Sequence, residues 1–348
     1  MRSVLHGVQL AGLCAAVPAS VETVDKSGYE SPEARRRFSA ATGVLRRRIC
    51  PPDLFFSDLA RVAAERILAE LGWEKSGVEA LVVVTQSGDV AYPSTACILQ
   101  HRLGLSTDCA AFDINLGCSG FPYGLFAAAR MLGKDNCSKA LLLIGDAAGK
   151  PNPADPRAPL FGDAAVAVAL QRDAAAAPMH FSLHTDGSGW DHIMERKPEG
   201  NPGFDSKAFN FVQDTDGRVH VNSQYQIKGA DVFNFSVRVV PAAVRDALER
   251  VGWPGNSVDA FVFHQASRLI NETIAKSLGL DSSKAPSTLA DFGNTSSATI
   301  PLTMADQLGA RLRAERLRLL LCGFGVGLSW GTVACEVGPM ICTPIVEV

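Results

Sequence analysis

An internal repeat limits the folds open to this chain more than any other feature of its sequence. Residues 71–84 reappear as residues 251–264, because in both segments a Gly-Trp pair is followed by an apolar, strand-like run. Further pairs of segments keep the same order along the chain: 103–105 with 278–280, 116–119 with 292–295, and 141–145 with 319–323. Such an ordered series indicates a duplicated unit. We therefore expect two related halves, residues 1–173 and 174–348.

The pattern within each half predicts an α/β fold. Short apolar or β-branched runs alternate with helical patterns, which favours mostly parallel sheets covered by helices. The expected strands include residues 4–13, 81–85 and 110–114, and the expected helices span residues 54–71 and 92–103. Residues 20–54 show no clear period and are expected to be irregular. A chain of 348 residues is long enough to bury a large core in this way.

A cysteine stands at the corner between a predicted strand and a predicted helix. Residues 110–114 predict a buried strand, residues 117–120 a tight turn, and the small residues that follow a helix. The thiol of Cys118 would face unpaired N–H groups and the positive end of the helix dipole, which should lower its pKa. Cys118 is therefore a candidate nucleophile. The alternative is a small, buried core cysteine.

The repeat places two further polar residues near this cysteine. His264 ends the segment that repeats residues 81–84, and Asn294 lies in the segment that repeats the turn around Cys118. Ligands of open α/β sheets bind at the carboxyl ends of the strands. We therefore expect a thiol, an imidazole and a carboxamide to converge. A buried core histidine and a helix-capping asparagine are the structural alternatives for these two residues.

Composition and cysteine usage exclude several classes of protein. The chain has 33 basic and 36 acidic residues, so its net charge of -3 predicts neither a nucleic-acid partner nor a membrane surface. Its nine cysteines are odd in number and contain no C-x-x-C pair, which favours reduced thiols in the cytoplasm and no metal site. No apolar run approaches membrane-spanning length, and the first residues contain no signal-peptide pattern.

Two other patterns have an ordinary and a functional interpretation. The arginine clusters at residues 35–37 and 46–48 are typical of a solvated face, but arginine side chains also bind phosphates. The glycine-rich run at residues 323–327 could suggest a phosphate loop. It contains neither the Walker lysine nor the full dinucleotide fingerprint, so we reject that interpretation.

Several blocks of the sequence resemble the signatures of the beta-ketoacyl-acyl carrier protein synthase III family. The main blocks are DINLGCSGF at residues 113–121, FHQAS at 263–267, FGNTSSATIP at 292–301 and GFGVGLSWG at 323–331. The resemblance spans most of the chain. It implies a thiolase-like fold, in which two pseudo-symmetric halves form αβαβα layers with mixed central sheets and buried helices. It also implies a homodimer and a catalytic triad of Cys118, His264 and Asn294.

The resemblance further implies an acyl-transferring ketosynthase reaction. Cys118 would take an acyl group from a coenzyme A or phosphopantetheine thioester, with the backbone N–H groups of Cys118 and Val326 forming the oxyanion hole. A malonyl-type thioester would then lose carbon dioxide while His264 and Asn294 bind its thioester oxygen, and a 3-ketoacyl thioester would result. Acyl carrier protein is the expected partner, and no metal or redox cofactor is expected.

The same resemblance assigns four peripheral residues. Tyr92 would reach across the dimer interface to line the partner's acyl pocket, and Phe161 would line the acyl pocket too. Arg268 and Arg46 would receive the phosphate of the substrate arm or of the carrier protein, although a surface salt bridge is the alternative for Arg268.

Two departures from the family pattern bear on the pathway. Housekeeping members have a tryptophan before the Thr-Gly pair that stacks on the adenine of coenzyme A, and residues 36–41 contain none. The arginine after His264 also stands one place earlier than in those members. These features argue against the usual acetyl-coenzyme A starter role. The blocks VFNF at residues 232–235 and GFGVG at 323–327 resemble pathway-specific members, which serve specialised fatty-acyl, cofactor-precursor or secondary metabolism. The main alternative activity is acyl transfer from Cys118 to an oxygen or nitrogen nucleophile, and a silent partner subunit is disfavoured by the retained cysteine.

Overall fold

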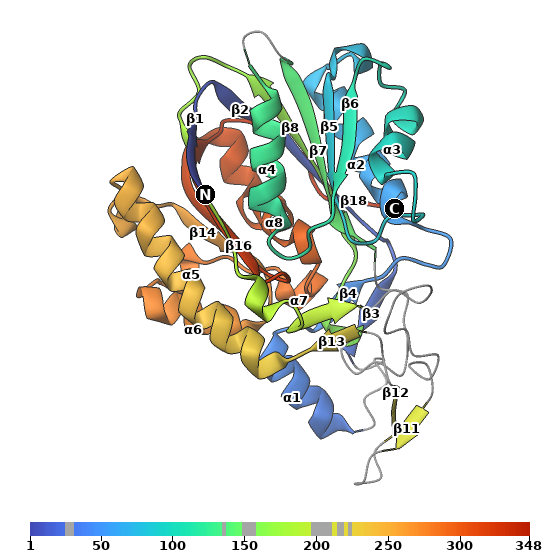
Figure 1. The fold of residues 1–348 in the computed structure, drawn as a ribbon, viewed down its shortest axis with the longest axis vertical. Coiled ribbons are helices and arrows are strands. Elements are labelled where there is room, and N and C mark those ends of the chain that lie inside the picture. Colours follow the sequence, from blue (N-terminus) through green and yellow to red (C-terminus); the bar gives the residue numbers. More distant parts are fainter. Residues whose placement is uncertain (25–30, 134–136, 148–157, 196–210, 214–218, 222–224) are drawn as a thin grey trace.

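The structure of the chain is a computed structural model that describes residues 1–24, 31–133, 137–147, 158–195, 211–213, 219–221 and 225–348. Within these residues the fold is built around two mixed β-sheets, and helices lie between and outside them (Figure 1). None of the described helices is long and apolar enough to cross a membrane.

The larger sheet belongs mainly to the first half of the chain. Its strands lie in the order β17 (Ile341–Cys342), β2 (Val8–Val17), β8 (Ala164–Arg172), β7 (Lys139–Asp146), β5 (Ala80–Val84) and β6 (Ala110–Ile114), with β18 (Val346–Glu347) also beside β2. β5 pairs in parallel with both β6 and β7. The carboxyl ends of these three strands therefore meet at one edge of the sheet.

The smaller sheet belongs mainly to the second half. Its strands lie in the order β1 (Arg2–Leu5), β9 (Met179–Thr185), β16 (Ser329–Val337), β15 (Leu317–Gly325) and β14 (Ala260–Phe263). β14 pairs in parallel with β15, which pairs antiparallel with β16. In the larger sheet β5, β7 and β8 repeat this arrangement. The two sheets thus contain the same three-stranded unit.

Helices fill the space between the sheets and cover both outer faces (Figure 1). α4 (Gly120–Met131) and α8 (Thr299–Ala314) contact strands of both sheets. α2 (Phe56–Leu71) and α3 (Thr95–Leu103) pack on the larger sheet, whereas α5 (Gly229–Val251) packs on the smaller one with α6 (Arg268–Leu278) against it. This is the expected αβαβα layering, and the α/β fold class is confirmed.

Shorter elements complete the described fold. They are α1 (Pro32–Thr42), α7 (Leu289–Phe292) and the strand pairs β3 (Val21–Thr23) with β4 (Arg46–Arg48), β10 (Ile193–Glu195) with β13 (Tyr225–Ile227), and β11 (Phe211–Gln213) with β12 (Val219–Val221). α7 packs on β4, and α1 packs on α6. These contacts bring segments of the two halves together.

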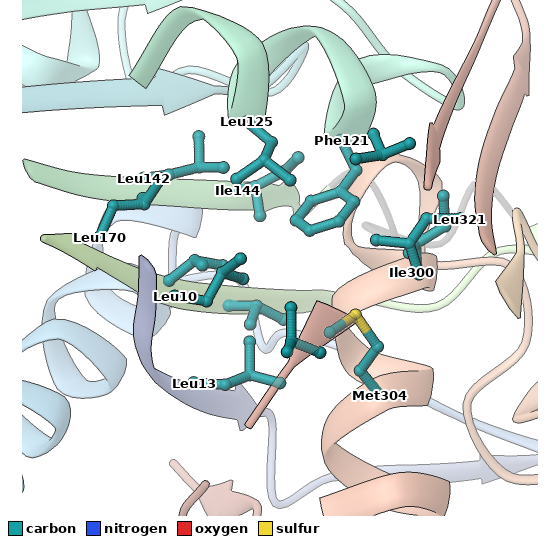
Figure 2. Packing of buried hydrophobic residues seen from close by; sticks show 14 of the residues in the cluster. Leu10, Leu13, Phe121, Leu125, Leu142, Ile144, Leu170, Ile300, Met304 and Leu321 are labelled. Carbon is teal, nitrogen blue, oxygen red and sulfur yellow. The ribbon is translucent and has the colours of Figure 1, made fainter. Parts of the chain in front are cut away.

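The central core lies where the two sheets meet α4 and α8 (Figure 2). Each fully buried aliphatic or aromatic side chain stabilises the fold by about 1.5–3 kcal/mol relative to exposure to water. The fully buried residues at this junction include Phe121 and Leu125 of α4, Ile300 and Met304 of α8, and Leu142 and Leu321 of the two sheets. The apolar face of each central helix therefore anchors both sheets at once.

The register of the strands corrects one part of the proposed repeat. The sequence comparison matched residues 141–145 with 319–323. In the sheets Ala80 pairs with Ala140, and its counterpart Ala260 pairs with Leu319, so the match is displaced by one residue. Strands that are buried on both faces have no alternating polar pattern from which their register could be inferred.

Three expected elements differ from the structure. Residues 4–13 were expected to form one strand, but the chain turns at Gly7 with φ 73°, and β1 and β2 lie in different sheets. Residues 20–54 are not irregular, because they contain β3, β4 and α1, whose first turn is capped by the hydroxyl of Ser31. The expected buried strand at residues 110–114 is an edge strand, β6, on which Phe112 is exposed.

The sheets also exchange their end strands. β1 comes from the first half of the chain but lies in the smaller sheet, and β17 and β18 come from the second half but lie in the larger one. Each half therefore depends on the other for part of its sheet. The division of the chain into residues 1–173 and 174–348 stays a prediction.

We expect Gly145→Ala to destabilise the fold. Gly145 has φ 150°, and a Cβ there would lie 2.0 Å from the carbonyl oxygen of Ala164 on β8. Because the backbone of β8 would have to move, the free energy of unfolding should fall by about 3 kcal/mol in urea denaturation. Gly255→Ala is the control, because nothing lies within 4 Å of a Cβ at that position. Equal unfolding midpoints for the two variants would contradict this account.

Candidate active site

Cys118 lies at the corner between β6 and α4, as the sequence predicts. The turn is closed by a hydrogen bond of 2.6 Å from the N–H of Gly120 to the carbonyl of Gly117. A buried contact of 2.6 Å between the hydroxyls of Ser119 and Ser329 ties the start of α4 to β16. A Cβ on Gly325, whose φ is 152°, would lie 2.5 Å from the Cβ of Cys118. The second half of the chain therefore packs directly against the cysteine.

His264 follows the last residue of β14 and is buried. Its backbone N–H extends the sheet by donating to the carbonyl of Cys322 at 2.8 Å. Its ring nitrogen Nδ1 lies 2.7 Å from the hydroxyl of Thr299, the first residue of α8. The imidazole is thus fixed through Nδ1, and Nε2 is the ring nitrogen left for other contacts.

Asn294 lies in the turn that follows α7 and is held by a loop of the first half. Its backbone N–H donates to the carbonyl of Leu160 at 2.9 Å, and its carbonyl accepts from the N–H of Gly162 at 3.1 Å. The side-chain oxygen of Asn294 accepts a hydrogen bond of 2.9 Å from the N–H of Ser296. The capping role considered from the sequence is therefore present in part, and the amide nitrogen is turned toward Ala266.

One cavity joins the three side chains. It has a volume of about 330 Å³, and Cys118, His264 and Asn294 all line it. The rest of its described wall is almost entirely apolar and comes from both halves of the chain. It includes Leu160, Phe161, Ile193, Ile227, Val232, Phe233, Ala266, Leu269, Ile270 and Phe324, together with Ser267, Gly229 and Gly325. The thiol, the imidazole and the carboxamide therefore converge on one cavity, as the sequence predicts.

The electrostatics of Cys118 differ from the sequence expectation. Burial raises the pKa of Cys118 from its ordinary value of 9.0 to about 11. The N–H groups of Val326 and of Cys118 itself lower this pKa, and the nearby carboxyl of Asp146 raises it. The expected lowering by the helix dipole is therefore wrong, because removal from water outweighs the backbone donors. The thiol keeps its proton at neutral pH.

His264 is also neutral at physiological pH. Burial lowers the pKa of His264 from 6.5 to about 3, against an opposing hydrogen bond with the backbone of Ser296. The site therefore contains a thiol and a neutral imidazole rather than a thiolate–imidazolium pair. Such a pair can exchange one proton within the cavity when a substrate arrives.

The other predicted site residues lie at different distances from the cavity. Phe161 forms part of its wall, and the backbone N–H of Val326 acts on the sulfur of Cys118. Arg268 donates to the carbonyl of Ala40, and Arg46 forms an ion pair of 2.7 Å with Asp291. Neither arginine belongs to the described cavity wall.

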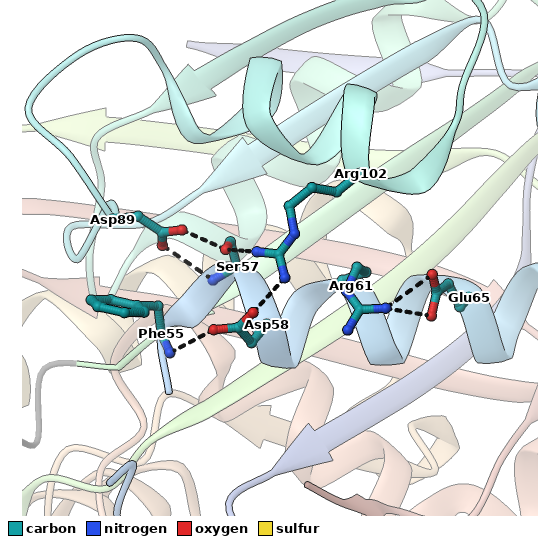
Figure 3. Close-up of polar contacts among 7 residues, drawn as sticks. All are labelled: Phe55, Ser57, Asp58, Arg61, Glu65, Asp89 and Arg102. Atoms are coloured by element: carbon teal, nitrogen blue, oxygen red, sulfur yellow. Dashed lines mark hydrogen bonds and ion pairs between the residues drawn. The ribbon is translucent and has the colours of Figure 1, made fainter. Parts of the chain in front are cut away.

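Tyr92 is 87% exposed and does not line the cavity of its own chain. It lies on the loop between β5 and α3. Polar contacts anchor this loop to α2 (Figure 3), because the carboxylate of Asp89 accepts from the N–H and the hydroxyl of Ser57. Arg102 of α3 donates to the same hydroxyl at 2.6 Å and pairs with Asp58. The loop is therefore held in place while Tyr92 points to solvent.

Sequence reasoning missed Arg47. Its side chain is buried and donates to the carbonyl of Phe161 at 2.8 Å and to Glu22 at 2.8 Å, so it supports the cavity wall. The cluster at residues 46–48 was interpreted as a solvated face, which is wrong for Arg47. Alternation along β4 was the available signal, because the middle of three strand residues points away from its neighbours. The sequence contains no pattern that would have assigned Thr299, or the apolar residues of β10, β13 and α5, to the site.

Among the residues that the structure describes, no group of three or more His, Cys, Asp or Glu side chains could hold a metal ion. The expectation that the reaction needs no metal or cofactor stays a prediction.

Comparison with protein families matches two segments of the chain. Residues 112–187 match the model of 3-oxoacyl-[acyl-carrier-protein (ACP)] synthase III, and residues 248–337 match the model of the C-terminal part of that enzyme. The first segment contains Cys118, and the second contains His264, Asn294 and Thr299. The three polar side chains of the cavity thus lie in segments that match the same family.

Individual relatives extend this similarity to the whole chain. A beta-ketoacyl-[acyl-carrier-protein] synthase III of Neisseria meningitidis serogroup B is 31% identical over 94% of this chain and 98% of its own length. The crystal structure of a 3-oxoacyl-(acyl-carrier protein) synthase from Burkholderia xenovorans LB400 is 34% identical, with a TM-score of 0.92 over 100% of this chain and 99% of that one. The priming beta-ketosynthase of the R1128 polyketide pathway is 25% identical, with a TM-score of 0.79 over 96% and 97% of the chains. This chain belongs to the beta-ketoacyl-acyl carrier protein synthase III family and has its thiolase-like fold.

Proposed function

We propose that the protein is a condensing enzyme that joins an acyl group on Cys118 to a malonyl-type thioester and releases a 3-ketoacyl thioester and carbon dioxide. The observation that supports this most is the apolar cavity shared by Cys118, His264 and Asn294. A nucleophile, a base and an amide donor around one cavity suit both acyl transfer and stabilisation of an enolate.

In the first step the sulfur of Cys118 attacks the carbonyl carbon of an acyl thioester. The thiol proton passes to Nε2 of His264, and the backbone N–H groups of Cys118 and Val326 bind the oxyanion. The bond between the acyl carbon and the donor sulfur then breaks, and the proton moves from Nε2 to the departing sulfur. The products are an acyl-enzyme and a free thiol.

In the second step a malonyl-type thioester enters the cavity. No charged side chain belongs to its described wall, so the malonyl carboxylate finds no ion pair there. Loss of water from an unpaired carboxylate favours its release as neutral carbon dioxide. The electron pair of the broken carbon–carbon bond forms an enolate, whose oxygen is bound by Asn294 and His264.

The enolate carbon then attacks the acyl carbon on Cys118. The new carbon–carbon bond forms, the bond from the acyl carbon to sulfur breaks, and a proton from solvent restores the thiol. These steps neither take electrons from an external donor nor pass them to an external acceptor, so the proposed reaction needs no metal or redox cofactor. Coenzyme A or phosphopantetheine thioesters enter as substrates.

We place the enzyme in a specialised fatty-acyl, cofactor-precursor or secondary-metabolite pathway in the cytoplasm, with acyl carrier protein as partner. The missing tryptophan at residues 36–41 supports this, because an adenine ring would lack its stacking surface. The similarity to a polyketide priming ketosynthase is in agreement with it. Arg46 and Arg268 would bind the phosphate of the carrier arm only after leaving their present partners.

We expect the purified protein to gain one acyl mass on Cys118 from a suitable acyl thioester in intact-protein mass spectrometry. Malonyl thioester should then release carbon dioxide and a product longer by two carbons. Cys118→Ala should abolish labelling, whereas Asn294→Ala should keep labelling and slow condensation about 10²–10³-fold. Cys97→Ala is the control, because Cys97 is exposed and outside the cavity wall.

Two outcomes would redirect the assignment. Labelling that survives Cys118→Ala would exclude that residue as the nucleophile. Labelling of Cys118 without condensation across a panel of extenders would favour acyl transfer to an oxygen or nitrogen nucleophile.

The raised pKa of Cys118 predicts the pH dependence of its alkylation. Since the pKa lies near 11, the thiolate fraction should grow with pH through the whole neutral range. The rate of reaction with iodoacetamide should therefore rise about tenfold for each unit from about pH 7 to about pH 9. Peptide mass spectrometry can follow Cys118 separately from the exposed Cys97. A rate that levels off below pH 8 would mean that the thiolate is stabilised instead.

We also propose a homodimer that forms along β6. This strand is the edge of the larger sheet, and Phe112 on it is 36% exposed. Tyr92, on the loop that precedes α3, is 87% exposed. An open edge with apolar side chains is a surface on which a second copy can extend the sheet. Tyr92 would then reach the acyl pocket of the partner.

Light scattering should give twice the chain mass of 36.9 kDa for the wild type. Phe112→Asp should give monomers, because a buried, unpaired carboxylate would oppose pairing at β6. Val21→Asp, at an exposed apolar residue of β3, should remain dimeric. A dimer that survives Phe112→Asp unchanged would place the interface elsewhere.

A further inference from the structure

A buried hydroxyl behind the cavity contacts His264 and has no part in the proposed chemistry so far. The Oγ1 atom of Thr299 lies 2.7 Å from Nδ1 of His264 and 3.0 Å from the carbonyl oxygen of Ser296. Thr299 and His264 are both 1% exposed. A hydroxyl has one hydrogen, so Oγ1 can donate to only one of these neighbours at a time.

The direction of this hydroxyl decides which ring nitrogen carries the proton. When Oγ1 donates to the carbonyl of Ser296, it accepts from Nδ1–H, and Nε2 has a free lone pair. When Oγ1 instead donates to Nδ1, the ring proton lies on Nε2, which becomes a donor. Because Nδ1 is engaged in both cases, Nε2 is the nitrogen available to the cavity that His264 lines.

We propose that Thr299 is a positioning residue that couples the direction of its hydroxyl to the tautomer of His264, so that Nε2 accepts a proton during acylation and donates a hydrogen bond during condensation. The inference rests on the proposed function. Acylation needs an acceptor for the proton of Cys118, and decarboxylation needs a donor for the enolate oxygen. The change passes through the imidazolium: Nε2 takes a proton from the cavity and Nδ1 releases its proton to solvent, so the ring neither gains nor loses a proton overall.

The backbone of Thr299 is held by a hydrogen bond from another residue, whereas its own hydroxyl contacts His264 and Ser296. The hydroxyl of Thr303 donates to the carbonyl of Thr299 at 2.8 Å and lies 2.9 Å from the hydroxyl of Thr288. The N–H of Thr288 in turn donates to the side chain of Gln265, next to the histidine, at 3.3 Å. All four residues are buried. This network supports Thr299 without touching the imidazole, so Thr303 offers a matched control.

The test compares Thr299→Val, Thr299→Ser and Thr303→Val. Valine keeps the shape of threonine but has no hydroxyl that could donate to Nδ1, and the hydrogen bond between the imidazole and the backbone of Ser296 remains. The ring should therefore stay in the form with a lone pair on Nε2. We expect Thr299→Val to acylate Cys118 within about threefold of the wild-type rate and to release carbon dioxide from malonyl thioester about 10²–10³-fold more slowly. Thr299→Ser should release carbon dioxide near the wild-type rate, and Thr303→Val should keep both half-reactions within about threefold of the wild type.

A second measurement does not depend on turnover. Nitrogen-15 shifts of histidine-labelled protein distinguish the two tautomers, and the signals of His264 are identified by their loss in His264→Ala. Thr299→Val should show Nδ1–H alone, before and after acylation. Where valine does not allow folding, Thr299→Ala makes the same comparison, with unfolding midpoints to match it to Thr303→Val.

The possible results separate this inference from the function on which it rests. A wild-type protein that is not acylated or does not condense overturns the proposed function, and the role of Thr299 with it. A wild type that condenses, with Thr299→Val and Thr303→Val equal in both half-reactions, overturns the role of Thr299 alone. Equal loss of acylation and decarboxylation in Thr299→Val also overturns it, because a mere structural contact would act on both steps.

Discussion

The cavity depends on a pair of backbone hydrogen bonds between the two halves of the chain. Asn294 donates to Leu160 and accepts from Gly162, so a turn of the second half is fixed to a loop of the first. This contact sets Phe161 into the cavity wall and places the carboxamide of Asn294 beside Cys118 and His264. Backbone bonds of this kind do not depend on side-chain identity. The geometry of the site is therefore a property of how the repeated units meet.

Burial decides the resting charge state of the site. Removal from water raises the pKa of Cys118 and lowers that of His264, so both groups stay neutral until a thioester brings developing charge into the cavity. The backbone N–H groups of Val326 and Cys118 hydrogen-bond the sulfur and favour its charged form. An interaction that stabilises only the charge of the transition state lowers the activation barrier, because it does not also stabilise the resting enzyme. The hydroxyl of Thr299 extends the same principle to the imidazole.

Two local sequence patterns gave wrong expectations about burial: the arginine run at residues 46–48 and the short apolar strand β6. The run Arg46, Arg47 and Arg48 has one composition but two environments, since only Arg47 is buried against Phe161 and Glu22. β5 and β6 are similar short, largely apolar runs, yet β5 is fully buried and β6 is the edge of its sheet. Composition reports hydrophobicity, whereas the place of a strand in its sheet depends on pairing with distant residues.

The sequence by itself determined the α/β class, the repeat, the corner that carries Cys118 and the meeting of that residue with His264 and Asn294. These inferences needed only local periodicity and the symmetry of a duplicated unit, which act over short stretches of chain. Tertiary structure alone decided the separation of β1 from β2, the register of β7 and β15, the raised pKa of Cys118 and the contact between Thr299 and His264. Each of these depends on packing between residues far apart in the sequence, and burial and hydrogen-bond partners exist only once those residues have met.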